Sequence, residues 1–243
     1  MWQRPSRIET APRFWARVAG VLYLLIIAAG LFAQFVRDQF IVPGNAAVTA
    51  SHITERAFMF RLGLAADLST FVCAVPLTII FYVLLRPVHQ NTALLVLVLT
   101  VVQDAIGGLN VLNTYRPLQL LGGAPYLNAF NREQLEAMAM LSLNAHSIGF
   151  NVAMIFFGFS CIALGYLLFV SGFFPKVLGV LLPIAGVCYL SLSTASLLSP
   201  RLASLLFPLI LVPAFIGELS FALWLTTKGV NEPEWRKAAE RSF

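Results

Sequence analysis

Long apolar runs separated by short polar segments fill most of the chain. These runs lie at about residues 15–36, 60–85, 92–114, 131–170, 176–198 and 202–227. A helix needs about 20 mainly apolar residues to cross the hydrocarbon core of a bilayer. The pattern therefore predicts an all-α, polytopic transmembrane helical bundle of about six spans.

The fourth run is the longest, and both of its ends carry helix signals. Asn131 followed by Gln134 is a variant of the capping box, and Ser171 with Gly172 ends the run. An unbroken helix over this run would be about 58 Å long, roughly twice the hydrocarbon thickness. We therefore expect this helix to protrude or bend, with its membrane part beginning near residues 146–149.

The composition agrees with this pattern. Hydrophobic residues make up 59% of the 243 residues, charged residues make up 11%, and the mean hydropathy is +0.82. No soluble domain of this length needs so much apolar surface, and the spans leave no room for a soluble catalytic domain. We expect an N-terminal segment over residues 1–14, a membrane domain over residues 15–227 and a charged tail over residues 228–243.

The basic residues predict the orientation of the chain. Ten of the 16 Lys and Arg residues fall on the side of both termini: Arg4, Arg7, Arg13, Arg17, Arg86, Lys176, Lys228, Arg236, Lys237 and Arg241. Because cytoplasmic segments carry the excess of Lys and Arg, both termini should be cytoplasmic, in the inner (plasma) membrane. The four tryptophans lie at or near the same side, as interface anchors do: Trp2, Trp15, Trp224 and Trp235. The basic residues are scattered, so we expect membrane lipids as partners and no nucleic acid.

Three acidic residues interrupt the apolar runs. Asp67, Asp104 and Glu218 each stand inside a predicted span. A charged side chain at the centre of a membrane helix costs about 2.5–3.5 kcal/mol on insertion scales, so it is usually paired, protonated or turned to a polar cavity. Arg61 lies about 9 Å from Asp67 along the same helix and is a candidate counter-charge. These acids are the strongest functional lead in the sequence.

Amides and one histidine add to the polar positions of the spans. Asn110 lies on a polar face of the third span, and Asn151 lies on a polar face of the fourth. His146 is the histidine nearest the membrane and would suit proton transfer or a metal ion. A metal held by His146 with Asp67 and Glu218 is chemically reasonable, although their spacing matches no metal motif.

Sequence signatures of catalysis are missing. The chain has no G-x-S-x-G, no H-E-x-x-H and no phosphate-binding loop of the G-x-x-x-x-G-K-[ST] type. The sequence therefore identifies no catalytic residue and no cofactor, and it favours a protein that is not an enzyme.

Several short stretches together resemble a bacterial membrane family known as domain of unknown function 4386. They are residues 16–20 (ARVAG), 41–44 (IVPG), 60–63 (FRLG), 66–68 (ADL), 121–127 (LGGAPYL), 156–158 (FFG), 165–169 (GYLLF) and 217–220 (GELS). The resemblance extends over about residues 14–231. It implies a membrane fold with recurring positions at Asp67, His146 and Glu218, and no settled activity. Asn151 departs from the family pattern, which often has an acid there.

These observations leave three functional hypotheses open. In the first, a polar interior lined by Asp67, Asp104, His146 and Glu218 binds or transports a small or amphiphilic ligand. Proton coupling through Asp104 or Glu218 belongs to this hypothesis, and so does a homodimer, because six spans are few for an independent transporter. In the second, the chain is an accessory subunit whose acids pair with another membrane protein. In the third, it is an intramembrane enzyme that acts on lipid or uses a metal.

Overall fold

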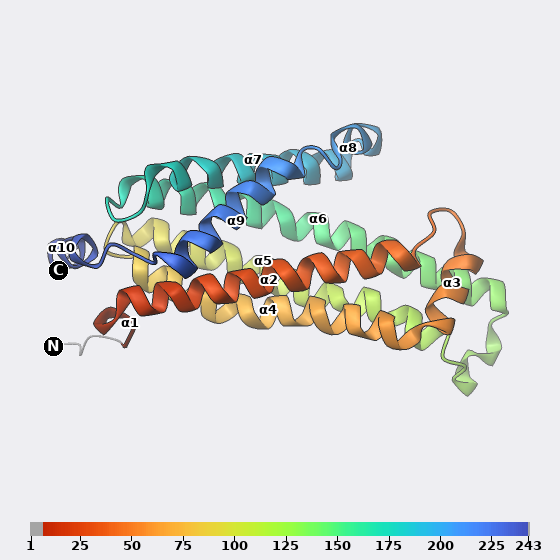
Figure 1. Ribbon diagram of the computed structural model, residues 1–243. Coiled ribbons are helices and arrows are strands. Elements are labelled where there is room, and N and C mark those ends of the chain that lie inside the picture. Colours follow the sequence, from red (N-terminus) through yellow and green to blue (C-terminus); the bar gives the residue numbers. More distant parts are fainter. Residues whose placement is uncertain (1–6, 243) are drawn as a thin grey trace. The chain divides into compact units, whose positions relative to one another are not determined.

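Every element of the described chain is a helix (Figure 1). The computed structural model describes residues 7–242, so the predicted positions of Trp2 and Arg4 lie outside the described residues. Within these described residues, five helices are long and apolar enough to cross a membrane: α2 (Pro12–Phe40), α4 (Ala57–Leu85), α5 (Gln90–Leu120), α6 (Arg132–Val170) and α7 (Lys176–Leu198). The prediction of an all-α, polytopic membrane protein is confirmed.

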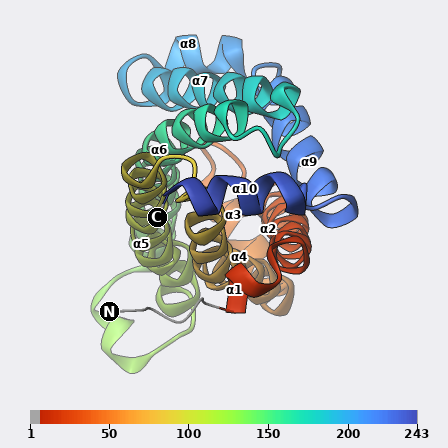
Figure 2. The ribbon, with the colours of Figure 1, turned by 90° about the vertical axis from the view of Figure 1, so that its left-hand side faces the viewer.

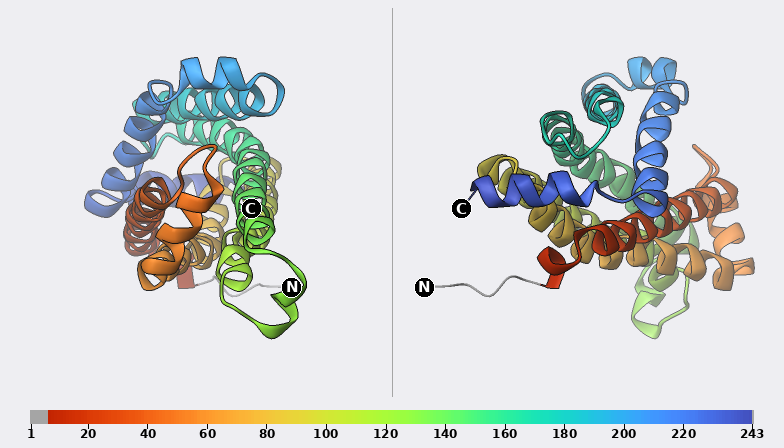
Figure 3. Two further views of the ribbon diagram at one scale, coloured as in Figure 1. Left: turned by 90° about the vertical axis from the view of Figure 1, so that its right-hand side faces the viewer. Right: turned by 60° about the vertical axis from the view of Figure 1, so that its left-hand side comes forward.

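The sixth predicted span, over about residues 202–227, consists of two helices in the structure. These are α8 (Pro200–Leu206) and α9 (Leu211–Thr227), which are bent by 59° at the break between them (Figure 3). Pro208 lies in that break, and a proline supplies no backbone N–H to continue a helix. The two helices together are long and apolar enough for one broken span, so about six spans remain consistent with the structure.

The fourth run is one continuous helix of 39 residues, and its ends lie where the terminal signals predicted. The backbone N–H of Gln134 donates to Asn131 Oδ1 at 2.9 Å, and the N–H of Asn131 donates to Gln134 Oε1 at 2.9 Å. This reciprocal capping box fixes the start of α6. At its other end Gly172 has φ of 75°, a left-handed conformation that glycine adopts without a steric penalty.

Short helices occupy segments that we predicted as connections or tail. They are α1 (Arg7–Thr10), α3 (Ala46–Glu55), the 3-10 helix η1 (Pro125–Ala129) and α10 (Glu232–Ser242). Asn45 caps α3 by accepting a hydrogen bond from the Val48 N–H at 3.0 Å. Trp235 anchors α10, because its ring is buried and its Nε1 donates to the Leu84 carbonyl at 2.8 Å. The charged tail is therefore a packed amphipathic helix.

The chain divides into two compact units, and α2, α4, α5 and α6 contribute residues to both. Unit 1 comprises the described residues of Met1–Leu25 together with Cys73–Asp104 and Asn151–Phe243, and unit 2 comprises Ile26–Val72 and Ala105–Phe150. An aromatic cluster of Tyr23, Phe81 and Phe221 lies in the core of unit 1. The tilted rings of Phe40 and Phe60 pack together in the core of unit 2, with 5.4 Å between their centroids.

The two described ends of the chain meet in unit 1, at the end shown in Figure 2. Arg236 of α10 donates from Nη2 to the Thr10 carbonyl at 3.3 Å. Arg13, at the start of α2, donates to the Lys228 carbonyl at 3.3 Å, just beyond the end of α9. These contacts place α1 and α10 on the same side of the membrane helices.

Candidate functional site

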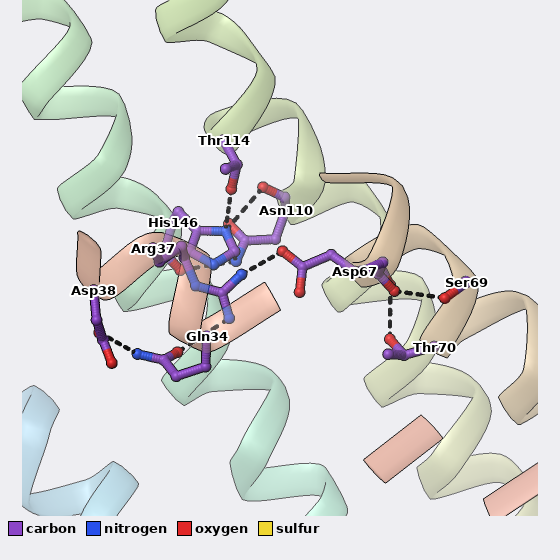
Figure 4. A network of polar contacts seen from close by, with 10 residues as sticks. Gln34, Arg37, Asp38, Asp67, Ser69, Thr70, Asn110, Thr114 and His146 are labelled. Atoms are coloured by element: carbon purple, nitrogen blue, oxygen red, sulfur yellow. Dashed lines mark hydrogen bonds and ion pairs between the residues drawn. The ribbon is translucent and has the colours of Figure 1, made fainter. Parts of the chain in front are cut away.

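An intramembrane ion pair joins α2 to α4 in unit 2. Arg37 Nη1 donates to Asp67 Oδ2, and the two side chains point toward each other in Figure 4. Only 12% of the Arg37 side chain and 13% of the Asp67 side chain are exposed. The counter-charge of Asp67 is therefore Arg37, and the prediction of Arg61 is wrong. Arg61 is exposed, and the structure shows no ion pair for it within residues 7–242.

The sequence did not identify Arg37 as the partner of Asp67. Arg37 stands just beyond the first apolar run, where a basic residue normally flanks a span, and 30 positions separate it from Asp67. Gln34, one helical turn earlier, accepts a hydrogen bond from Arg37 Nη2 at 3.1 Å. Gln34 in turn donates to Asp38 at 2.8 Å. Gln34 therefore helps to hold the Arg37 guanidinium in the orientation in which it binds Asp67.

His146 packs against α5 in the same unit. Its Nδ1 lies 2.9 Å from Thr114 Oγ1 and 3.2 Å from Asn110 Nδ2, and Asn110 also donates to the His146 carbonyl at 2.8 Å (Figure 4). No partner of Nε2 lies within residues 7–242. The charges of Arg37 and Asp67 both act on the ring. Unit 2 therefore gathers three predicted residues, Asp67, Asn110 and His146, around the unpredicted Arg37.

A glycine allows the close approach of α5 to α6 in this network. A Cβ added at Gly149 would collide with the side-chain amide of Asn110. Gly149 lies one turn after His146 on α6, so its small size lets Asn110 reach both the ring and the backbone of His146. The sequence alone did not predict the contact between Asn110 and Gly149.

Glu218 of α9 lies in unit 1, where two phenols bind it. Tyr23 of α2 donates to Oε2 at 3.2 Å, and Tyr189 of α7 donates to Oε1. The residue is 9% exposed, and Cys161 is close enough to interact with it electrostatically. Tyrosines inside apolar runs look like ordinary packing residues, so the sequence did not reveal either partner. The carboxylate joins three helices.

Asp104 of α5 differs from both other acids. It belongs to unit 1, it is 8% exposed, and its Oδ2 is buried with no hydrogen-bond partner within residues 7–242. One turn earlier on α5, Thr100 hydrogen-bonds with Ser160 of α6 at 2.8 Å between their hydroxyl oxygens. A buried carboxyl oxygen without a partner is costly, so this position needs a proton, a cation or a ligand that donates a hydrogen bond.

Asn151, the remaining predicted residue, lies on α6, belongs to unit 1 and is half-buried. Within the described residues, no three His, Cys, Asp or Glu side chains gather so as to hold a metal ion, so the set of His146, Asp67 and Glu218 gains no support. Two hollows of about 440 Å³ each are lined by other residues than the predicted acids and histidine.

Comparison with known proteins adds one assignment. No curated protein matches the chain, and no solved structure matches it. A family model described as domain of unknown function (DUF4386) matches residues 18–229, which include every long apolar helix in whole or in large part. The chain is a multi-pass membrane protein that belongs to the family described as domain of unknown function (DUF4386).

Proposed function

We propose that this protein binds or transports a small or amphiphilic ligand within the inner (plasma) membrane and exchanges a proton at Asp104. The observation that supports the proposal most strongly is the buried Oδ2 of Asp104, which has no hydrogen-bond partner in the described part of the chain. Ionisable residues inside membrane helices are expensive and commonly mark proton relays or ion pathways. Asp104 Oδ2 can take up and release a proton without breaking a hydrogen bond to another described residue.

The other two intramembrane acids suit this role less well. Asp67 is paired with Arg37, and Glu218 accepts hydrogen bonds at both carboxylate oxygens. Protonation of Asp67 would remove its charge pairing with Arg37, and protonation of Glu218 would weaken the hydrogen bonds that it accepts from two phenols. We therefore assign the exchangeable proton to Asp104 and a structural role to the other two carboxylates.

The two alternative functions have weaker support. An accessory subunit would turn its acids toward a partner protein, whereas Asp67 and Glu218 bind groups of their own chain and Asp104 is buried within it. An intramembrane enzyme would bring acids and His146 to a common reaction centre. Among the described residues His146 approaches one acid, Asp67, which Arg37 already binds. A homodimer is compatible with the proposed ligand passage.

Proton exchange at Asp104 can be tested without knowing the ligand. Purified protein in proteoliposomes should show proton flux, reported by a pH-sensitive dye inside the vesicles under an imposed potassium diffusion potential. Infrared difference spectra across a pH step should show the C=O stretch of a protonated carboxyl group. We expect Asp104→Asn to abolish both signals, because an amide does not exchange a proton in this way.

Glu218→Gln is the matched control, since it also replaces an intramembrane acid by its isosteric amide. It should retain the proton flux and the infrared band assigned to Asp104. Undiminished flux and an unchanged band in Asp104→Asn would overturn the proposal. Loss of both signals in Glu218→Gln, with the band retained in Asp104→Asn, would assign the proton to Glu218 instead.

A further inference from the structure

A hollow of about 440 Å³ opens in unit 2, and Asp67, the predicted intramembrane acid of that unit, is not among the residues that line it. Residues of α3, of the connection between α5 and α6 and of the start of α6 line it. These elements lie at the end of unit 2 that faces the viewer in the left panel of Figure 3. Its apolar lining includes Leu120, Leu121, Leu127 and Leu135. Ligand sites typically have volumes of about 300–1,000 Å³ and combine apolar walls with a few polar groups.

Two charged side chains of opposite sign line the same hollow. Arg132 and Glu136 are four residues apart on the first turns of α6, and Arg132 Nε donates to Glu136 Oε1 at 2.8 Å. Their exposure is very unequal, since 85% of the Arg132 side chain but only 9% of the Glu136 side chain is accessible. Ordinary ion pairs on a helix surface keep both partners in water and contribute little to stability.

The hydrogen bonding of this pair is incomplete. A carboxylate has about four lone-pair positions, yet Glu136 has one hydrogen bond, at Oε1, within the described chain. The guanidinium of Arg132 is held at Nε, which leaves its Nη1 and Nη2 without a partner in the same residues. The hollow therefore has a carboxylate that can accept further hydrogen bonds and, beside it, a guanidinium that can donate them. Both groups lie next to apolar walls.

We propose that this hollow binds an amphiphile with a zwitterionic phosphate–ammonium headgroup. The terminal nitrogens of Arg132 match the oxygens of a phosphate, which guanidinium groups bind through two parallel hydrogen bonds. A primary ammonium can donate hydrogen bonds to Glu136, whereas a quaternary ammonium cannot. Side chains four apart on a helix have Cβ atoms about 5–6 Å apart, which suits two charges separated by a short linker. The apolar walls cover the start of an acyl chain.

The charge balance favours this ligand over a singly charged one. An anionic amphiphile would approach Arg132 but leave Glu136 with a single hydrogen bond. A cationic amphiphile would be repelled by the guanidinium of Arg132. A zwitterionic headgroup satisfies both side chains at once and adds no net charge to the hollow. This inference is independent of proton exchange, because the hollow lies in unit 2 and Asp104 lies in unit 1.

A photoreactive lipid tests the site directly. The full-length protein in detergent is incubated with a lysophosphatidylethanolamine that carries a diazirine and an alkyne on its acyl chain. After irradiation, the modified peptides are mapped by mass spectrometry. We expect crosslinks in the segments 50–54 and 120–136, which line the hollow. The same probe with an N-acetylated amine should label these segments at least about tenfold less, because it loses a charge-assisted hydrogen bond.

Variants separate the site from general partitioning into detergent. Arg132→Gln and Glu136→Gln should each lower the crosslinking of these segments at least about tenfold. Arg116→Gln is the matched control, since Arg116 is an exposed arginine of the same unit outside the hollow, and it should leave the crosslinking unchanged. Thr54→Trp should reduce crosslinking by filling the hollow from α3. Thermal melting of each variant verifies that it is folded.

Competitors distinguish the source of the headgroup. Loss of crosslinking with free phosphoethanolamine supports binding of the headgroup itself, as in a soluble metabolite. Loss only with unlabelled phosphatidylethanolamine or its lyso form supports binding of a membrane lipid. Failure of all of these competitors would overturn the proposal. Equal labelling by the N-acetylated probe, or unchanged labelling in Arg132→Gln, would also overturn it.

Discussion

At the scale of single residues, Arg37 and Asp67 show how the chain accommodates charge inside the membrane. The two side chains are 12% and 13% exposed, and they bind each other across α2 and α4. Removing one partner of such a pair leaves a buried charge without compensation. Arg37→Met should therefore lower the free energy of unfolding by about 3–5 kcal/mol, measured by thermal or denaturant unfolding in detergent.

Two further variants make the Arg37 prediction specific. The double variant Arg37→Met with Asp67→Leu should be more stable than Arg37→Met alone, because it removes both charges. Arg61→Met is the control, since Arg61 shares α4 with Asp67 but is exposed, and it should change stability by less than about 0.5 kcal/mol. An equal loss in Arg61→Met and Arg37→Met would contradict the assigned pairing.

At the scale of whole helices, small residues determine how closely the helices approach. A Cβ added at Gly20 of α2 would meet the Thr226 backbone nitrogen and would lie 2.8 Å from the Leu225 carbonyl carbon of α9. Gly20→Ala should therefore force these helices apart and lower the free energy of unfolding by about 1–3 kcal/mol. Thermal unfolding of the purified protein in detergent measures the change.

Gly30, on the same helix, provides the control for Gly20. A Cβ added there would meet no atom within 4 Å, so Gly30→Ala should leave stability unchanged or raise it by up to about 1 kcal/mol through better helix propensity. If Gly30→Ala proved as destabilising as Gly20→Ala, the effect would come from the helix itself and not from its contact with α9.

At the scale of the whole molecule, the contacts between the chain ends bear on the number of crossings. Arg236 of α10 binds the Thr10 carbonyl, so both described ends lie on one side of the membrane helices. A chain whose ends share a side crosses the membrane an even number of times. Five helices of the described chain are long enough to cross singly, so we predict a sixth crossing made by the bent pair of α8 and α9, which together are long and apolar enough for one broken span.

Cysteine labelling tests this arrangement and the cytoplasmic location of both ends. In a background without Cys73, Cys161 and Cys188, Lys237→Cys should resist a membrane-impermeant maleimide in intact cells and react after lysis. Asn128→Cys, in η1, should react in intact cells, because the positive-inside rule places this connection outside. Labelling of Lys237→Cys in intact cells would reverse the predicted orientation.

The sequence by itself determined the membrane class, five of the long helices and the capped start of α6, because apolar length and local capping depend on neighbouring residues alone. It also identified Asp67, Asp104 and Glu218, since an acid inside an apolar run stands out without any structure. The partners of these acids were decided by tertiary structure. Arg37 resembles a flanking charge, and Tyr23 and Tyr189 resemble packing residues, until folding brings separate helices together. The hollow beside Arg132 likewise depends on three-dimensional packing, which hydropathy does not encode.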